Sequence, residues 1–91
     1  MNEMKKVFRI SLDIPFVQHE IELPHDAKVV HFGEDVYGGL SFWYEFDPDI
    51  DYVETRIFHV VDTNMAVGIS SEYRGTCNHG GLTYHLYETY L

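Results

Sequence analysis

Two arginines are the residues of this sequence best suited to binding chemistry. Arg56 lies two residues from Phe58, and Arg74 follows Tyr73, each in the middle of a segment that alternates like a β-strand. An arginine inside a sheet of an acidic chain is most often an ion-pair partner. The alternative is a planar fork that binds a phosphate or carboxylate of a small ligand, with stacking from Trp43, Tyr73 or Tyr84. The sequence leaves both roles open.

Sequence patterns for catalysis are absent. The chain has no GxxxxGK[ST], GxGxxG, GxSxG or HExxH motif. Its single cysteine, Cys77, has His79 and His85 as the sequence-local bases, and two-residue spacing in a turn is weak evidence for a catalytic pair. No nucleophile, base and orienting group can be placed together. We therefore expect a protein that is not an enzyme, with no catalytic residue and no cofactor.

Metal binding is also not expected, although the chain has six histidines. They lie in separate predicted strands and turns, so ordinary structural histidines are the default interpretation. A zinc site made by Cys77, His79 and His85 is an open alternative, because two neighbouring strands could bring these side chains together. The alternating acids from Asp47 to Asp51 lack the glycine and the terminal glutamate of an EF-hand loop, so we interpret them as a solvated loop.

The charge of the chain limits its partners. Fifteen Asp and Glu against six Lys and Arg give a formal net charge of −9, which repels nucleic acid at long range. We therefore expect no direct nucleic-acid binding. The acidity fits a solvated surface, and alternatively a decoy that occupies a basic groove on another protein.

Length and composition indicate one domain over residues 1–91. The chain is too short for two domains, and its 45% hydrophobic content is that of a globular protein. Its apolar runs are too short to cross a bilayer, and a single cysteine allows no internal disulfide. The opening segment MNEMKKVFRISLDI reads as a start into a strand rather than as a secretory leader. We expect a cytoplasmic protein with no membrane partner.

The hydrophobic pattern repeats with a period of two, which predicts strands rather than helices. Segment 40–46 carries aromatic residues on both faces, so we expect it to be central or to meet a partner. Gly80 and Gly81 predict a tight hairpin, Pro24–Ala27 a turn, and Pro15 an interruption. The fold class is therefore all-β and mainly antiparallel, a small sandwich or partly open barrel of six to seven strands. The predicted strands are 5–12, 17–23, 28–32, 40–46, 54–62, 70–78 and 82–88.

Four ordered segments carry a family resemblance. The segments IELPHDAKVVHF, LSFWYEFDP, ETRIFHVVDTN and YRGTCNHGGLTYHLYE resemble, in that order, a family of small uncharacterised phage and prophage proteins. Val61–Asn64 departs from the Gly-Thr-Gly-His that members of that family carry there. The matching positions are Glu22, Leu23, Pro24, Ala27, Trp43, Asp47, Pro48, Glu54, Arg56, Phe58, Tyr73, Gly75, Thr76, His85, Leu86, Tyr87 and Glu88.

The resemblance implies a phage context, in which small acidic proteins without catalytic motifs often act against host defence. Our leading expectation is a non-enzymatic protein that sequesters a small, anionic, nucleotide-derived immune signal in the host cytoplasm. The alternative is an acidic inhibitor that blocks a host defence or nucleic-acid-binding protein through Glu34, Asp35, Asp47, Asp49, Asp51 and Glu54. A structural or accessory phage protein is a third interpretation. The residues expected to bind the ligand are Arg56, Arg74, Trp43, Tyr73, Thr76 and His85.

Self-association is a further expectation. A small β domain has exposed edge strands, and aromatic side chains on both faces of segment 40–46 leave surface to bury. We expect a homodimer or a larger symmetric ring with Trp43 at or near the interface.

Overall fold

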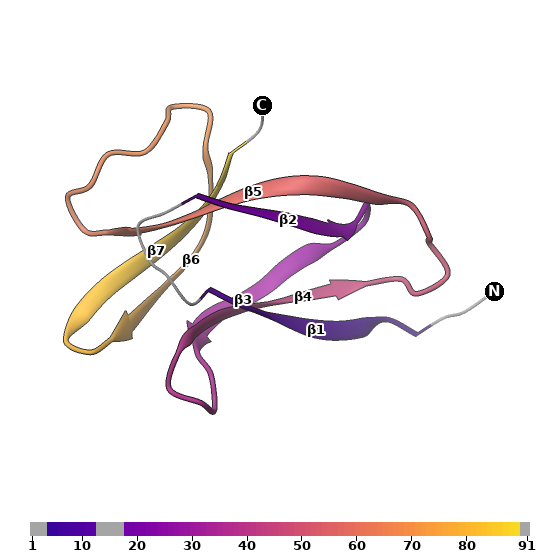
Figure 1. The fold of residues 1–91 in the computed structure, drawn as a ribbon, viewed down its shortest axis with the longest axis horizontal. Helices are drawn as coiled ribbons and strands as arrows, with labels where there is room; N and C mark the ends of the chain where they lie inside the picture. The colour runs from indigo at the N-terminus through magenta and orange to yellow at the C-terminus, as the bar shows by residue number, and fades with distance from the viewer. Residues whose placement is uncertain (1–3, 13–17, 90–91) are drawn as a thin grey trace.

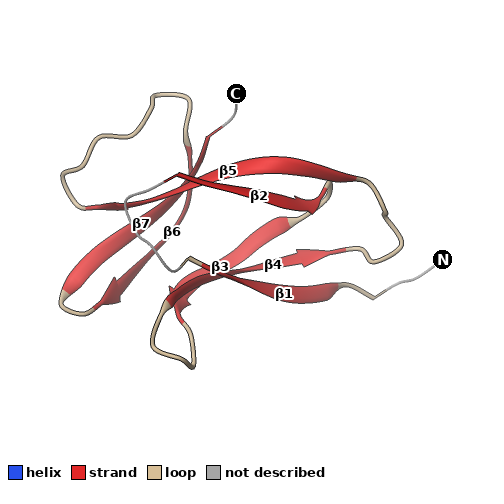
Figure 2. Cartoon of the chain, viewed as in Figure 1, coloured by secondary structure: helices blue, strands red, loops and turns tan. Residues whose placement is uncertain are grey.

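A computed structural model of the chain describes residues 4–12 and 18–89. These residues form strands, turns and loops without a helix (Figure 2), which confirms the predicted all-β class. Pro15, predicted to interrupt the pattern between the first two strands, and Val17, predicted to begin the second strand, lie outside the described residues. The strands are β1 (Lys6–Ser11), β2 (Gln18–Pro24), β3 (Lys28–Glu34), β4 (Leu40–Phe46), β5 (Val53–Asp62), β6 (Glu72–His79) and β7 (Leu82–Thr89).

The strands build two antiparallel sheets that face each other as a sandwich (Figure 1). One sheet has the order β1-β4-β3 and the other the order β2-β5-β7-β6. We call them the three-stranded and the four-stranded sheet. The two sheets do not join into a closed barrel, so of the two predicted architectures the sandwich is observed.

The core forms where the alternating apolar faces of the two sheets meet. Phe42 of β4 stacks on Phe58 of β5, with ring centroids 4.6 Å apart, and both side chains are fully buried. Strand β4 lies between β1 and β3, so the central position predicted from its two aromatic faces is confirmed. The other buried members of this core are Leu12, Leu23, Ala27, Phe32, Leu40, Tyr44, Phe46, Val60, Tyr84 and Leu86.

Turn chemistry sets the register of the hairpins. Gly80 and Gly81 have φ of 57° and 82°, as the two central positions of a type I′ turn require, and they join β6 to β7 as predicted. Between β3 and β4, the Asp35 carboxylate accepts hydrogen bonds from the Tyr37 and Gly39 amides and from the Ser41 hydroxyl. The Ser41 hydrogen bond is the largest cause of the lowered pKa of Asp35. The conformation of the β3–β4 loop is therefore held by hydrogen bonds to the side chain of one of its own residues, Asp35.

One side of the sandwich is closed by a close approach of β3 to β6. A Cβ placed on Gly75 of β6 would lie 3.0 Å from the Cβ of Phe32 on β3. A β-bulge between Tyr73 and Gly75 interrupts the register of β6 with β7 at this point. Gly75 thus allows the edge strands of the two sheets to pack against each other, because any side chain there would push them apart.

We predict that Gly75→Ala destabilises the protein by about 1–3 kcal/mol, since the Phe32 Cβ belongs to the backbone frame and cannot swing away. Gly68→Ala is the matched control, because its added Cβ would meet the Ser71 Oγ at 3.5 Å, an ordinary contact. Urea denaturation of both variants measures the effect. A Gly75→Ala midpoint equal to that of Gly68→Ala would contradict the steric role of Gly75.

Candidate functional site

The central feature of the candidate site is a buried ion pair on the inner face of the four-stranded sheet. Arg56 of β5 donates from Nε to Glu88 Oε2 at 2.7 Å and from Nη2 to Glu88 Oε1 at 2.8 Å. Its Nη1 donates to the carbonyl oxygen of Ala27 at 2.6 Å. The Glu88 side chain is fully buried and that of Arg56 is 9% exposed. Arg56 therefore has the ion-pair role that the sequence left open, and its fork is directed at Glu88.

Arg74 of β6 approaches the same carboxylate from the other side. Its Nε donates to Glu88 Oε1 at 3.1 Å, and its Nη2 lies 3.1 Å from the Glu72 carboxylate. The bulge next to Gly75 turns this side chain toward Glu88 on β7. The Arg74 side chain is more open to solvent than that of Arg56.

The two arginines control the ionisation of Glu88. Burial by itself raises the pKa of this carboxyl, but the hydrogen bonds and charge of Arg56, followed by those of Arg74, outweigh burial and hold the pKa below its ordinary value. Glu88 is therefore a carboxylate at neutral pH, inside the protein, with two cationic partners.

A hollow of about 330 Å³ opens beside this network, at one end of the two sheets. Half of the chain's six Lys and Arg residues line it: Lys28, Arg56 and Arg74. Tyr73 also lines the hollow, with 56% of its surface exposed, and its ring lies edge-on to Tyr87. The two remaining lining residues, Ala27 and Val29, are apolar. The hollow thus combines local positive charge with an aromatic ring.

A second group of predicted residues lies on the outer face of the four-stranded sheet. His85 of β7 is held from both ring nitrogens: Nδ1 lies 2.9 Å from the Thr76 hydroxyl and Nε2 lies 3.0 Å from the Thr63 hydroxyl. The Tyr73 hydroxyl lies 2.6 Å from the same Thr76 oxygen and extends the chain of hydrogen bonds. His85 is thus oriented by its neighbours.

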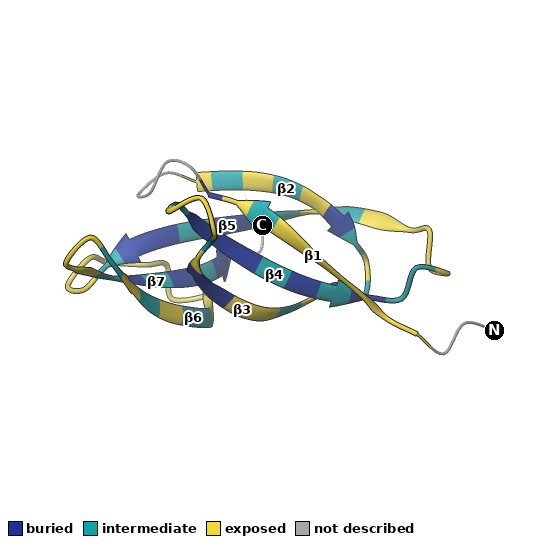
Figure 3. Cartoon of the chain, turned by 90° about the horizontal axis from the view of Figure 1, so that it is seen from below, coloured by how far each residue is buried: buried dark blue, intermediate teal, exposed yellow. Residues whose placement is uncertain are grey.

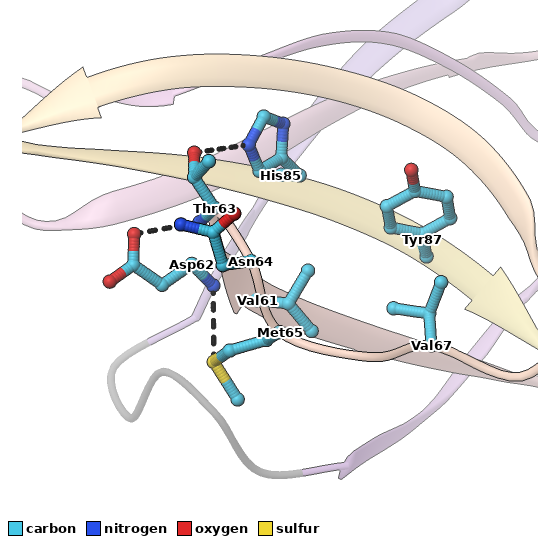
Figure 4. Close-up of a pocket in the computed structure, with 8 residues that line it drawn as sticks. All are labelled: Val61, Asp62, Thr63, Asn64, Met65, Val67, His85 and Tyr87. Atoms are coloured by element: carbon cyan, nitrogen blue, oxygen red, sulfur yellow. Dashed lines mark hydrogen bonds between the residues drawn. The ribbon is translucent and has the colours of Figure 1, made fainter.

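A smaller pocket of about 170 Å³ lies next to His85, between β7 and the loop that follows β5 (Figure 4). Met65 from that loop lies close to Val61, and Val67 lies beside Tyr87 (Figure 4). Asn64 has a positive φ of 77° where the chain leaves β5. The four residues Val61–Asn64 all line this pocket.

Trp43 lies apart from both groups. It belongs to the outer face of the three-stranded sheet, where it is opposite Arg9 of β1 and tilted against the ring of His31 at 5.1 Å. Trp43 lines neither the cationic hollow nor the smaller pocket. The single ligand site predicted from six residues is therefore divided. Arg56, Arg74 and Tyr73 surround the hollow, Thr76 and His85 are joined to Tyr73 by hydrogen bonds, and Trp43 is separate.

The structure does not bring together the zinc ligands of the open alternative. Thr76 is opposite His85, and Cys77 is opposite Tyr84, so Cys77 and His85 point to opposite faces of the sheet. In the described part of the chain no three His, Cys, Asp or Glu side chains are placed to hold a metal ion. Burial and then the Glu34 carboxylate raise the pKa of the Cys77 thiol, which disfavours the reactive thiolate.

Two members of the site had no role in the sequence reasoning. The sequence pattern predicts only a short strand for Lys28, and Glu88 is a matching position to which it gives no function. A signal for Glu88 was present, because Tyr84, Leu86 and Glu88 share the inward face of one alternating strand. A carboxylate at the end of an apolar face requires a cationic partner, and Arg56 and Arg74 were the mid-strand candidates.

These features define a class: a two-layer antiparallel β-sandwich domain in which a buried Arg–Glu–Arg network borders a small cationic hollow. A family model matches residues 4–91, and the chain belongs to that family, DUF7352, a domain of unknown function. Comparisons with curated proteins and with solved structures gave no match. Among residues 4–12 and 18–89 no helix is long and apolar enough to span a membrane.

We predict that Glu88→Gln lowers the free energy of unfolding by about 3–5 kcal/mol, because it leaves the buried Arg56 guanidinium without its counter-charge and removes one of the two carboxylates that Arg74 contacts. Glu72→Gln is the control: it removes an exposed partner of Arg74 and should cost about 0–1 kcal/mol. Arg56→Lys keeps the charge and loses the fork, so it should lie between these two. Chemical denaturation at pH 7 compares the three variants, and equal midpoints would exclude a central role for the network.

The same network predicts the acid response. An unfolded glutamate titrates near pH 4.3, and the folded-state pKa of Glu88 is lower. The ion pair therefore stabilises the fold fully above about pH 4.3 and loses this contribution as the pH falls through the folded-state value. Denaturation measured from pH 7 down to about pH 3 should show a decline that is smaller in Glu88→Gln. A parallel decline in both proteins would contradict the assignment.

Proposed function

We propose that this protein binds a small anionic, nucleotide-like ligand in the hollow lined by Lys28, Arg56, Arg74 and Tyr73, and holds it without converting it. The supporting observation is the concentration of positive charge. Three of six Lys and Arg residues lie at one hollow, although the chain has a net charge of −9. An anion repelled by the protein as a whole needs such a local field to bind.

The residues that line the hollow would have different roles in binding the ligand. All three guanidinium nitrogens of Arg56 donate to Glu88 or Ala27, so Arg56 supplies positive charge at the base of the hollow. Lys28 is exposed at the start of β3, and Arg74 lies at the rim, so these two side chains would contact the phosphate or carboxylate. The exposed ring of Tyr73 would stack against a base. The volume of about 330 Å³ is at the small end of known ligand pockets.

The biological setting that we propose is sequestration of a nucleotide-derived immune signal in the cytoplasm of a phage-infected host. The resemblance to small phage and prophage proteins supports this setting. The absence of a catalytic motif in the sequence supports binding rather than turnover. His85 and Thr76 would act indirectly, because Thr76 is hydrogen-bonded to both the Tyr73 hydroxyl and His85 and so orients the Tyr73 ring.

The alternative function, an acidic inhibitor of a basic protein, is less well supported by the arrangement of the acids. Glu34 and Asp35 lie before β4, and the acids of residues 47–51 follow it, so the two groups are at opposite ends of a seven-residue strand. The Asp35 side chain is 3% exposed and is bonded to Arg9 and Ser41. A single basic groove on a partner would have to contact two separated loops. In one of these loops the Asp35 carboxylate is already buried and hydrogen-bonded within the protein.

We predict that a panel of cyclic nucleotides and ADP-ribose derivatives raises the melting temperature for at least one compound, since a ligand that binds the folded state stabilises it by mass action. Lys28→Ala should weaken binding of that compound by about 5- to 30-fold, which corresponds to about 1–2 kcal/mol. The melting temperature without ligand should not change, because Lys28 is exposed. Differential scanning fluorimetry and calorimetric titration give both values.

Lys6→Ala is the matched control, because Lys6 is also an exposed lysine on an edge strand and does not line the hollow. Equal affinity of the Lys28→Ala and Lys6→Ala variants would remove the hollow from consideration. A panel without any shift at millimolar concentration would reject the proposed function.

A further inference from the structure

The sandwich has two different sides. Strands β3 and β6 pack together on one side, through Phe32 and Gly75. The other side is bounded by β1 and β2, each of which has one neighbouring strand among those that the structure describes. Most of β1 and alternate residues of β2 are exposed (Figure 3). Two sheet edges therefore lie on the same open side, one from each sheet.

The register shows which backbone groups face outward on β1. The Leu12 amide donates to the Leu40 carbonyl, in the register that pairs β1 with β4. Hydrogen-bonded pairs alternate along an antiparallel ladder, so Phe8 and Ile10 direct their amides and carbonyls toward β4. Val7 and Arg9 direct theirs to the open edge, and their side chains lie on the outer face of the sheet.

The same argument applies to β2. The His25 amide donates to the Tyr52 carbonyl, in the register that pairs β2 with β5. The alternation makes Ile21 and Leu23 the residues bonded to β5, while Glu20 and Glu22 direct their backbone groups to the open edge. Their carboxylates lie on the outer face. On both edges, the backbone groups available for pairing therefore belong to residues whose side chains lie on the outer face. Two such edges can pair antiparallel with their outer faces on the same side of the joined sheet.

The charges of the two edges are complementary. On the outer face β1 carries Arg9, which also donates to Asp35, and β2 carries Glu20 and Glu22; Lys6 adds a positive charge at the start of β1 on the other face. Pairing β1 with a second β1, or β2 with a second β2, would bring like charges together, which is destabilising. Phe8 on β1 is a half-exposed aromatic residue whose side chain is on the inner face, so the open side also has apolar surface to cover.

We propose that the protein forms a two-fold symmetric dimer in which β1 of each subunit pairs antiparallel with β2 of the other. Because both edges lie on one side, a single two-fold axis along the strands makes the contact twice. Each three-stranded sheet then continues into the four-stranded sheet of the partner. One register pairs all six residues of β1 with β2 of the partner subunit. It places Arg9 opposite Glu20 of the partner subunit and Val7 opposite Glu22 of the partner subunit. Phe8 then lies opposite Ile21 of the partner subunit.

This arrangement differs from the interface expected from the sequence. Trp43 lies on the outer face of the middle strand and not at either edge, so the proposed dimer does not use it. The residues that line the cationic hollow include none from β1 or β2. Self-association and ligand binding can therefore be tested independently.

The test is the mass in solution at several protein concentrations, by light scattering and sedimentation, for the wild type and three variants. The wild type should have twice the 10.6 kDa chain mass. Val7→Glu should weaken the dimer by about tenfold or more, because it places a carboxylate opposite Glu22. Adding Glu22→Lys to that variant should restore the dimer. Val36→Glu is the matched control, because Val36 is an exposed valine in the β3–β4 loop, and it should have no effect.

A wild-type protein that stays at 10.6 kDa over the whole concentration range would overturn the proposal. So would a Val7→Glu dimer as stable as that of Val36→Glu, or a failure of Glu22→Lys to restore association. Circular dichroism of each variant verifies that the fold is retained, because Val7 and Glu22 have solvent-exposed side chains and outward backbone groups.

Discussion

The buried carboxylate of Glu88 is the constraint on which the arrangement of the four-stranded sheet depends. A charge at a fully buried position is tolerated when it is paired and hydrogen-bonded, and Glu88 receives Arg56 from β5 and Arg74 from β6. Arg56 also binds the Ala27 carbonyl in the turn from β2 to β3. One network therefore connects strands β5, β6 and β7 to the segment that leads into the other sheet. The bulge beside Gly75 is part of the same arrangement, because it orients Arg74 and lets β6 approach β3.

The network that stabilises the fold also shapes its electrostatics. Glu88 draws two arginines to one end of an acidic protein, and Lys28 adds a third cation at the rim of the hollow. The carboxylate offsets part of this charge from beneath, with Glu72 on the exposed side of Arg74. The positive charge that we propose for ligand binding is therefore a consequence of how the core pairs one buried carboxylate, that of Glu88. On this proposal, variants of Arg56 would change both stability and ligand binding, whereas variants of Lys28 would change ligand binding alone.

The two sides of this sandwich, where the edges of the sheets lie, differ in packing and in charge. Glycine allows β3 and β6 to close one side, while on the other side β1 and β2 keep charged residues of opposite sign. Charged edge strands discourage indiscriminate pairing, and charges of opposite sign on two edges at the same time favour one specific pairing over self-pairing of either strand. The hollow and the proposed interface are thus consequences of the same topology, in which the edges of the sheets differ in charge and in packing.

Local pattern in the sequence determined the elements: the period of two gave seven strands, the two aromatic faces of segment 40–46 placed it centrally, and Gly80–Gly81 gave the hairpin turn. These features follow from contacts between near neighbours and from backbone preferences that each residue carries with it. The grouping of the site residues was decided by tertiary structure. In the sequence, Trp43 and Arg56 have similar surroundings, because each lies on a predicted strand with aromatic neighbours. In the fold they belong to different sheets. Whether Arg74 faced Glu88 depended on a bulge, which shifts the alternation by one residue and has no reliable local signature. Arg56 became an ion-pair partner because the fold brought a carboxylate from 32 positions further along the chain within 2.7 Å of it.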